Sequence, residues 1–198
     1  MKDNELWQKA TNLGNRAAQH DLVILYTLRK GDDKNFDKAF ELSRKLAEDE
    51  CLLGIMILGD CYQDEIGTSI DKRKAFELYQ KAANLGNSRA QCSLANMYED
   101  GVGVDKDYNK AFELYKNSAE GGVSNGITML GHCYQNGIGT KINKKKAFES
   151  YQNTANLGNN AAQWVLANMH ENGVVLIRII IRLLNYIKNQ LKEDFQVE

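Results

Sequence analysis

The chain has 198 residues, of which 43% are hydrophobic and 26% are charged, and its net charge is −1. This is the composition of a globular protein with a core of its own, and it excludes a charge-driven binder of nucleic acid or of an anionic membrane. The sequence contains no proline, which favours helices joined by glycine-based turns. Its four cysteines form no C-x-x-C pair, so we expect a reduced protein with a cytoplasmic location.

A repeat of 36 residues runs through the chain. The dipeptide Ala-Phe stands at 39–40, 75–76, 111–112 and 147–148. In this register the copies occupy residues 2–37, 38–73, 74–109, 110–145 and 146–173. Self-similarity at such a period is the signature of a repeat architecture. We therefore interpret residues 1–173 as one repeat array.

Each copy predicts a first helix that ends at a glycine. In the third copy, residues 75–85 bring Phe76, Tyr79 and Ala83 onto one face at helical spacing. Gly86 follows at the position where a residue in the left-handed conformation commonly ends a helix. We therefore expect a tight turn between this helix and the next.

A second helix is expected from about residue 88 to residue 100. Gly101 and Gly103 interrupt it, because glycine adopts positive φ angles at little cost. Asp105 or Asp107 can then cap the first helix of the next copy. One helix pair cannot bury its own apolar face, so the copies must stack. The sequence thus predicts an all-α fold, a right-handed α/α solenoid of five 36-residue helix-turn-helix repeats with one continuous core and no closed pocket.

The copies resemble Sel-one-like repeats, the 36-residue relatives of tetratricopeptide repeats. The family pattern A-x-x-x-Y-x-x-A-A-x-x-G-x-x-x-A-Q-x-x-L-G/A-x-x-Y-x-x-G-x-G-V is matched in the third copy at Ala75, Tyr79, Ala82, Ala83, Gly86, Ala90, Gln91, Leu94, Ala95, Tyr98, Gly101, Gly103 and Val104. The resemblance covers residues 2–173. The second copy departs from it at Ser43 and Glu50, and the first copy departs at 29–31, so we expect these two copies to pack less regularly.

Tyrosines and glutamates recur at fixed repeat positions. A base-stacking platform would need basic neighbours along a groove, so we interpret the tyrosines as core residues: Tyr26, Tyr62, Tyr79, Tyr98, Tyr115, Tyr134 and Tyr151. We expect the glutamates to form solvated ion pairs with lysines three residues before or four residues after them. The glutamates are Glu5, Glu41, Glu77, Glu113 and Glu149, and the lysines are Lys2, Lys38, Lys74, Lys110, Lys146, Lys9, Lys45 and Lys81.

Candidates for catalysis or metal binding are weak. Cys61 and Cys133 share a repeat position beside Asp60 and His132, but neighbouring copies hold methionine or leucine there, which indicates a packing position. Cysteine-rich members of the family connect the two helices of a repeat with a disulfide, which needs one cysteine in each helix. Only the second copy has two cysteines, and both Cys51 and Cys61 fall on or next to its second helix, so this disulfide is not expected. No H-E-x-x-H or Ser/His/Asp pattern occurs. We expect no enzyme activity, no metal, no cofactor and no small-molecule substrate.

The resemblance implies a protein–protein interaction scaffold or adaptor whose partners are other proteins, often in signalling or degradation complexes. In related solenoids the first helices line a concave side that holds a partner segment. By that analogy the partner-binding candidates are variable positions of the first helices: Gln80, Lys81, Asn84, Lys116, Asn117, Glu120, Gln152, Asn153 and Asn156. Ordinary solvated helix faces are the alternative for these residues. The alternative for the whole chain is the regulatory repeat region of a larger enzyme, such as a protein kinase, whose catalytic domain lies elsewhere.

An apolar tail at 174–198 departs from the repeat. Arg178 and Arg182 interrupt its aliphatic run, so it is too short for a membrane span and lacks the polar face of an amphipathic helix. Codons chosen for residues 175–195 and read one frame off spell IDKDYNKAFELYQKSAEGGF, which continues the repeat in register. We therefore interpret the tail as a frameshifted sixth repeat, a hypothesis that the nucleotide sequence tests. A helix that covers the end of the fifth copy is the remaining alternative.

Overall fold

The computed structural model describes residues 33–171 and 173, and its regular elements are all helices. They are α3 (Asp33–Glu48), α4 (Leu52–Asp64), α5 (Lys72–Asn84), α6 (Ser88–Asp100), α7 (Tyr108–Glu120), α8 (Ser124–Asn136) and α9 (Lys144–Asn156), followed by a helix over 160–171. In this part of the chain no strand occurs, and the all-α repeat fold is confirmed. Most of the first copy and the apolar tail at 174–198 lie outside the described residues.

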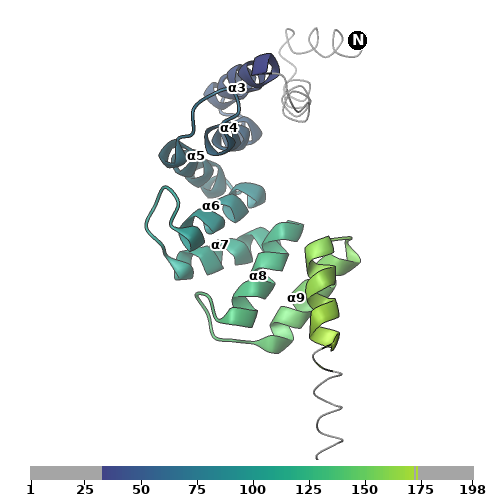
Figure 1. The fold of residues 1–198 in the computed structure, drawn as a ribbon. Coiled ribbons are helices and arrows are strands. Elements are labelled where there is room, and N and C mark those ends of the chain that lie inside the picture. Colours follow the sequence, from purple (N-terminus) through teal and green to yellow (C-terminus); the bar gives the residue numbers. More distant parts are fainter. Residues whose placement is uncertain (1–32, 172, 174–198) are drawn as a thin grey trace, which may run out of the picture.

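The helices form successive hairpins in a curved stack (Figure 1). The first helices of the copies are α3, α5, α7 and α9, and the second helices are α4, α6, α8 and the helix over 160–171. The second helices α4, α6 and α8 each pack both against their own first helix and against the first helix of the next copy, as α4 does with α5 and α6 with α7. None of the described helices is long and apolar enough to cross a membrane.

Side-chain caps fix where the first helices begin. Asp71, Asp107 and Asn143 precede α5, α7 and α9, and each side chain accepts a hydrogen bond from the backbone N–H three residues later at 3.0 Å. This bond satisfies one of the amides that have no partner within the helix. The cap at Asp107 confirms one of the two predicted positions. The cap at Asp71 explains why the helix in the third copy begins at Lys72, three residues before the predicted start.

The predicted glycine turns are present, and in the second copy glutamates stand at two of the positions where other copies have glycine. Gly86 has a φ of +88° and Gly101 a φ of +72°. In the second copy Glu50 and Glu65 adopt φ angles of +56° and +61°. A residue with a Cβ pays a steric cost in this conformation. The second copy therefore keeps the helical hairpin of the other copies, at a cost in backbone strain.

The core follows the stack and is divided into two clusters in the described part of the chain. The larger cluster runs from Ala39 to Cys133, and a smaller one consists of Ala147, Tyr151 and Ala162. Residues of α8 pack against both clusters, Leu130 against the larger and Tyr134 against the smaller, so the core continues into the fifth copy. That copy has no described neighbour on its outer side, where Trp164 is 69% exposed.

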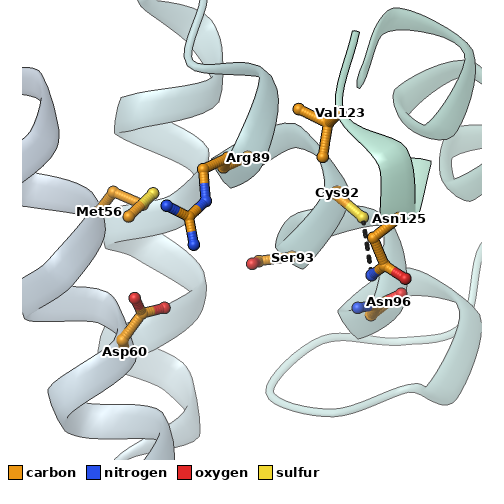
Figure 2. Close-up of a pocket in the computed structure, with 8 residues that line it drawn as sticks. All are labelled: Met56, Asp60, Arg89, Cys92, Ser93, Asn96, Val123 and Asn125. Carbon is orange, nitrogen blue, oxygen red and sulfur yellow. Dashed lines mark hydrogen bonds between the residues drawn. The ribbon is translucent and has the colours of Figure 1, made fainter. Parts of the chain in front are cut away.

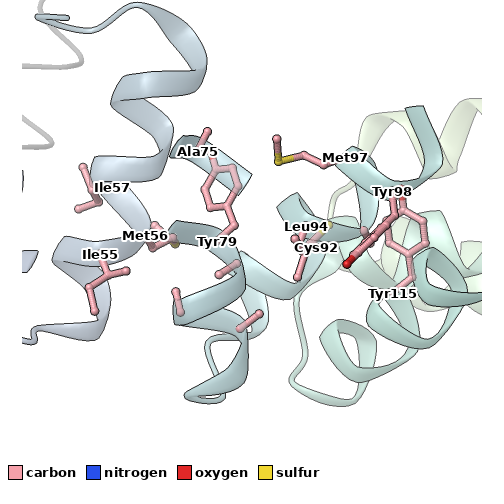
Figure 3. Packing of buried hydrophobic residues seen from close by; sticks show 14 of the residues in the cluster. Ile55, Met56, Ile57, Ala75, Tyr79, Cys92, Leu94, Met97, Tyr98 and Tyr115 are labelled. Atoms are coloured by element: carbon pink, nitrogen blue, oxygen red, sulfur yellow. The ribbon is translucent and has the colours of Figure 1, made fainter. Parts of the chain in front are cut away.

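Three tyrosines from first helices connect the copies. Tyr79, Tyr115 and Tyr151 are almost completely buried, and Tyr79 and Tyr115 lie in the core between neighbouring helices (Figure 3). A Cβ added to Gly59 would lie 2.8 Å from the ring of Tyr79, and one added to Gly131 would lie 3.1 Å from the ring of Tyr151. The small residue in the second helix of the repeat pattern is therefore required by the tyrosine of the following copy.

Candidate functional site

The buried tyrosines carry their hydroxyl groups to polar residues of the preceding copy. Tyr79 donates to Asp60 Oδ1 at 2.6 Å, and Tyr151 donates to Gln135 Oε1 at 2.8 Å. The single hydroxyl proton of Tyr115 is shared between Asn96 Oδ1 at 2.6 Å and Glu99 Oε2 at 2.7 Å. Burial raises the pKa of all three phenols, that of Tyr151 to about 12. These tyrosines are structural, which confirms their interpretation as core residues.

Lysines at the start of the first helices cover the other set of tyrosines. The Lys74 ammonium lies 5.0 Å from the centre of the Tyr62 ring, and Lys110 and Lys146 lie similarly over Tyr98 and Tyr134. An ammonium over a ring face is attracted by the ring quadrupole. Lys74 and Lys110 also form ion pairs with the capping residues, Asp71 at 3.4 Å and Asp107 at 3.5 Å, in place of the glutamates expected from the sequence.

The glutamates do form ion pairs, but with other cations. The distances are 3.7 Å for Glu41–Arg44, 3.6 Å for Glu77–Arg73, 3.9 Å for Glu113–Lys116 and 4.0 Å for Glu149–Lys145. All these side chains are largely exposed, so each pair contributes little to stability. The expected solvated pairs are therefore present, with different lysine or arginine partners.

The nine predicted partner-binding residues all lie exposed on the later turns of first helices. α5 carries Gln80, Lys81 and Asn84, and the equivalent positions of α7 and α9 carry the other six. The repeat therefore places chemically different side chains on one face at a regular spacing. Among the nine, Lys116 forms an ion pair, with Glu113 of its own helix. The geometry leaves the nine side chains accessible to a partner.

A pocket that the sequence did not predict lies on the second helices. It has a volume of about 170 Å³ and is bordered by α4, α6 and the start of α8 (Figure 2). Its lining residues are Met56, Asp60, Arg89, Cys92, Ser93, Asn96, Val123 and Asn125. None of them belongs to the predicted set. The pocket arises because the polar side chains of three successive copies meet where their second helices adjoin.

Opposite charges border this pocket. Burial raises the pKa of the Asp60 carboxyl group, whereas its hydrogen bond from Tyr79 and the positive charge of Arg89 lower it. Arg89 extends its guanidinium group into the pocket towards Asp60 (Figure 2). On another wall, Asn125 Nδ2 donates to Cys92 Sγ at 3.5 Å. The pocket thus combines charged, amide and hydroxyl groups with the apolar side chains of Met56 and Val123.

The cysteines are free thiols without the environment of a nucleophile. Cys61, Cys92 and Cys133 are buried, and Cys51 is half-buried. Burial raises the pKa of Cys61 to about 11 and that of Cys133 to about 12, so both remain protonated near neutral pH. Cys61 and Cys133 are members of the core cluster, which confirms the packing interpretation. No group of three possible metal ligands occurs among the described side chains.

The repeat register could have revealed the pocket. Asp60 and Asn96 share one repeat position, and Arg89 and Asn125 share another. Both positions lie on second helices, and both vary in charge between copies. The predicted binding face consists of first-helix positions alone, so it does not include these residues.

The family model described as "Sel1 repeat" matches five segments of the chain. They are residues 17–50, 53–87, 88–123, 124–159 and 160–178. The four matches that begin within the described residues start near a second helix, whereas the copies defined above begin at a first helix, so the same period is divided at a different point. A comparison with curated protein sequences finds no match.

Solved structures with a similar fold come from several bacteria. A protective antigen of uropathogenic Escherichia coli, described as having an SLR fold, has a TM-score of 0.72 and 27% identity over 85% of this chain, which spans only 36% of the antigen's chain. A Sel1 repeat protein from Oxalobacter formigenes has a TM-score of 0.68 and 28% identity, over 84% of this chain and 71% of that one. Helicobacter pylori cysteine rich protein B has a TM-score of 0.53 and 26% identity, over 69% and 98%. Because the family model matches most of the sequence, the chain belongs to the Sel1 repeat family.

Proposed function

We propose that this chain is a non-catalytic scaffold or adaptor that binds a segment of a partner protein on its solenoid surface. Sel1 repeat proteins are generally protein-interaction scaffolds. The observation that carries the proposal is the exposed face of α5, α7 and α9, where three successive copies present different polar side chains on one scaffold. No observation favours the alternative of a regulatory repeat region attached to an enzyme such as a protein kinase.

Variation within a fixed frame supports this role. The first row of the face reads Gln80, Lys116 and Gln152, and the last row reads Asn84, Glu120 and Asn156. Their backbone positions are set by the repeat, whereas their charge and hydrogen-bonding groups differ. A long partner segment can therefore be recognised by a sequence of contacts rather than by one deep site. The four free thiols support a reducing, cytoplasmic location as part of the same proposal.

The test is a pull-down with the full chain in which one row is removed. The variant replaces Gln80, Lys116 and Gln152 with alanine. The matched control replaces Asp64, Asp100 and Asn136, which are exposed residues one repeat apart at the ends of second helices. We expect specific partners to be retained by the wild type and by the control, and to be lost or reduced at least tenfold with the row variant.

Two outcomes would contradict the proposal. Equal recovery of the same proteins by the wild type and the row variant would show that this face is not the binding surface. The absence of any protein that is enriched over a bead control would contradict the scaffold function itself. Circular dichroism of all three chains shows whether the helical array is intact, so a loss of binding can be separated from a loss of fold.

A further inference from the structure

The pocket between α4, α6 and α8 holds two charged groups that are not satisfied by each other. Arg89 forms no ion pair within 4.0 Å in the described part of the chain, although its guanidinium group faces the pocket (Figure 2). Asp60 accepts one hydrogen bond, from the Tyr79 hydroxyl to its Oδ1. Its second oxygen, Oδ2, is left as an acceptor. The pocket therefore offers donors on one wall and an acceptor on another.

The charges restrict which ligand group fits. A carboxylate ligand would be attracted by Arg89 but repelled by the carboxylate of Asp60. An ammonium ligand would be attracted by Asp60 but repelled by Arg89. Like charges at close range in a partly desolvated site repel strongly. A neutral group that accepts from the guanidinium and donates to the carboxylate satisfies both walls. A primary carboxamide has these two functions on one carbon atom.

The size and apolar lining of the pocket restrict the ligand further. A volume of about 170 Å³ is enough for one side chain but not for a folded segment. Met56 and Val123 supply apolar contacts for the methylene groups that lead to the amide. A backbone amide is continued by polypeptide on both sides, so it cannot enter a small pocket alone. A side-chain amide is the end of its side chain and can enter alone.

We infer that this pocket binds the carboxamide of a glutamine or asparagine side chain in the partner segment. The inference rests on the proposed function, because it assumes that a protein segment reaches the array. The amide oxygen accepts from Arg89, the amide N–H donates to Asp60, and the aliphatic part lies between Met56 and Val123. The pocket would then act as a specificity site on the second helices.

The test is an NMR titration of the 15N-labelled full chain with three small probes. The probes are the N-acetyl methylamides of glutamine, glutamate and alanine, which share the backbone amides and differ in the side chain. We expect the glutamine probe to give saturable shifts at pocket residues, with a dissociation constant on the order of 1–10 mM for a ligand of this size. The glutamate and alanine probes should bind at least tenfold more weakly. Equal shifts with all three probes, stronger binding of glutamate, or no shifts at the pocket would each overturn the inference.

A pair of variants separates the pocket from the rest of the surface. Arg89→Met keeps the length of an exposed side chain and removes the donor, so it should weaken binding of the glutamine probe at least tenfold. Arg73→Met changes an exposed arginine at the start of α5 that does not line the pocket, and it should leave the affinity unchanged. The probe titration needs no partner protein. If the glutamine probe does not bind but the pull-down gives the expected result, the amide site alone is rejected. If the probe binds as expected but the row variant recovers the same partners as the wild type, the proposed face of the first helices is rejected.

Discussion

Replacing Tyr115 with phenylalanine tests whether hydroxyl bonds between copies stabilise the stack. Tyr115 is fully buried and its hydroxyl proton is shared between Asn96 and the carboxylate of Glu99. A hydrogen bond to a charged group contributes roughly 1.5–3 kcal/mol, and a neutral one roughly 0.5–1.5 kcal/mol. The Glu99 side chain is only 15% exposed, so water restores little of the lost bond. We therefore expect Tyr115→Phe to lower the free energy of unfolding by about 2 kcal/mol.

The equivalent tyrosine of the next copy is the matched control. Tyr151 donates to the neutral side-chain amide of Gln135, so Tyr151→Phe should cost about 1 kcal/mol or less. Urea denaturation followed by circular dichroism compares the two, and hydrogen exchange in α6 and α7 shows where the loss occurs, because repeat arrays need not unfold in one step. A cost below about 0.5 kcal/mol for Tyr115→Phe, or one no larger than for Tyr151→Phe, would refute the reasoning.

Three further predictions concern strain, charge burial and thiol reactivity. Glu50→Gly should stabilise the chain by about 0.5–1 kcal/mol in urea denaturation, since Glu50 adopts a φ of +56° that glycine adopts at less cost; a loss of stability would contradict this. Burial raises the pKa of Asp60 above its usual value of 3.8, so its contribution to stability is present below that value and is lost as the pH rises through the folded pKa. Asp60→Asn should therefore unfold at higher urea than wild type at pH 7, and the difference should close towards pH 4; a pH-independent difference would argue against it. Iodoacetamide should modify the half-buried Cys51 first, and the buried Cys61 and Cys133, with pKa values raised to about 11 and about 12, at least tenfold more slowly by mass spectrometry; equal rates would show that the core opens readily.

The repeat period predicted most of the fold. The second helix of the third copy was expected at 88–100 and is found at Ser88–Asp100. This succeeded because glycine turns and apolar spacing act locally, and both recur in every copy. The start of the first helix was placed late, at residue 75 instead of Lys72. The Asp71 cap lies four residues before Ala75, the first residue of the apolar face, so apolar spacing alone does not detect it.

Contacts between copies were harder to predict than the copies themselves. The pairing of Lys74 with Glu77 was expected from helical spacing, but Lys74 pairs with Asp71 at 3.4 Å and lies over the Tyr62 ring of the preceding helix. Likewise, the pocket joins Asp60 to Arg89 from different copies. Spacing along one helix contains no information about the side chain that a neighbouring helix presents. The nine residues on the first helices are exposed, as a binding face requires, and their role stays a prediction.

Hydrogen exchange on the complex with a captured and purified partner tests the scaffold function most directly. The account predicts that binding protects α5, α7 and α9 together, at the turns that carry Gln80, Lys116 and Gln152. It also predicts that the row variant neither binds the partner nor shows this protection. Protection confined to a single copy, or full binding by the row variant, would contradict the claim that successive copies hold one partner segment.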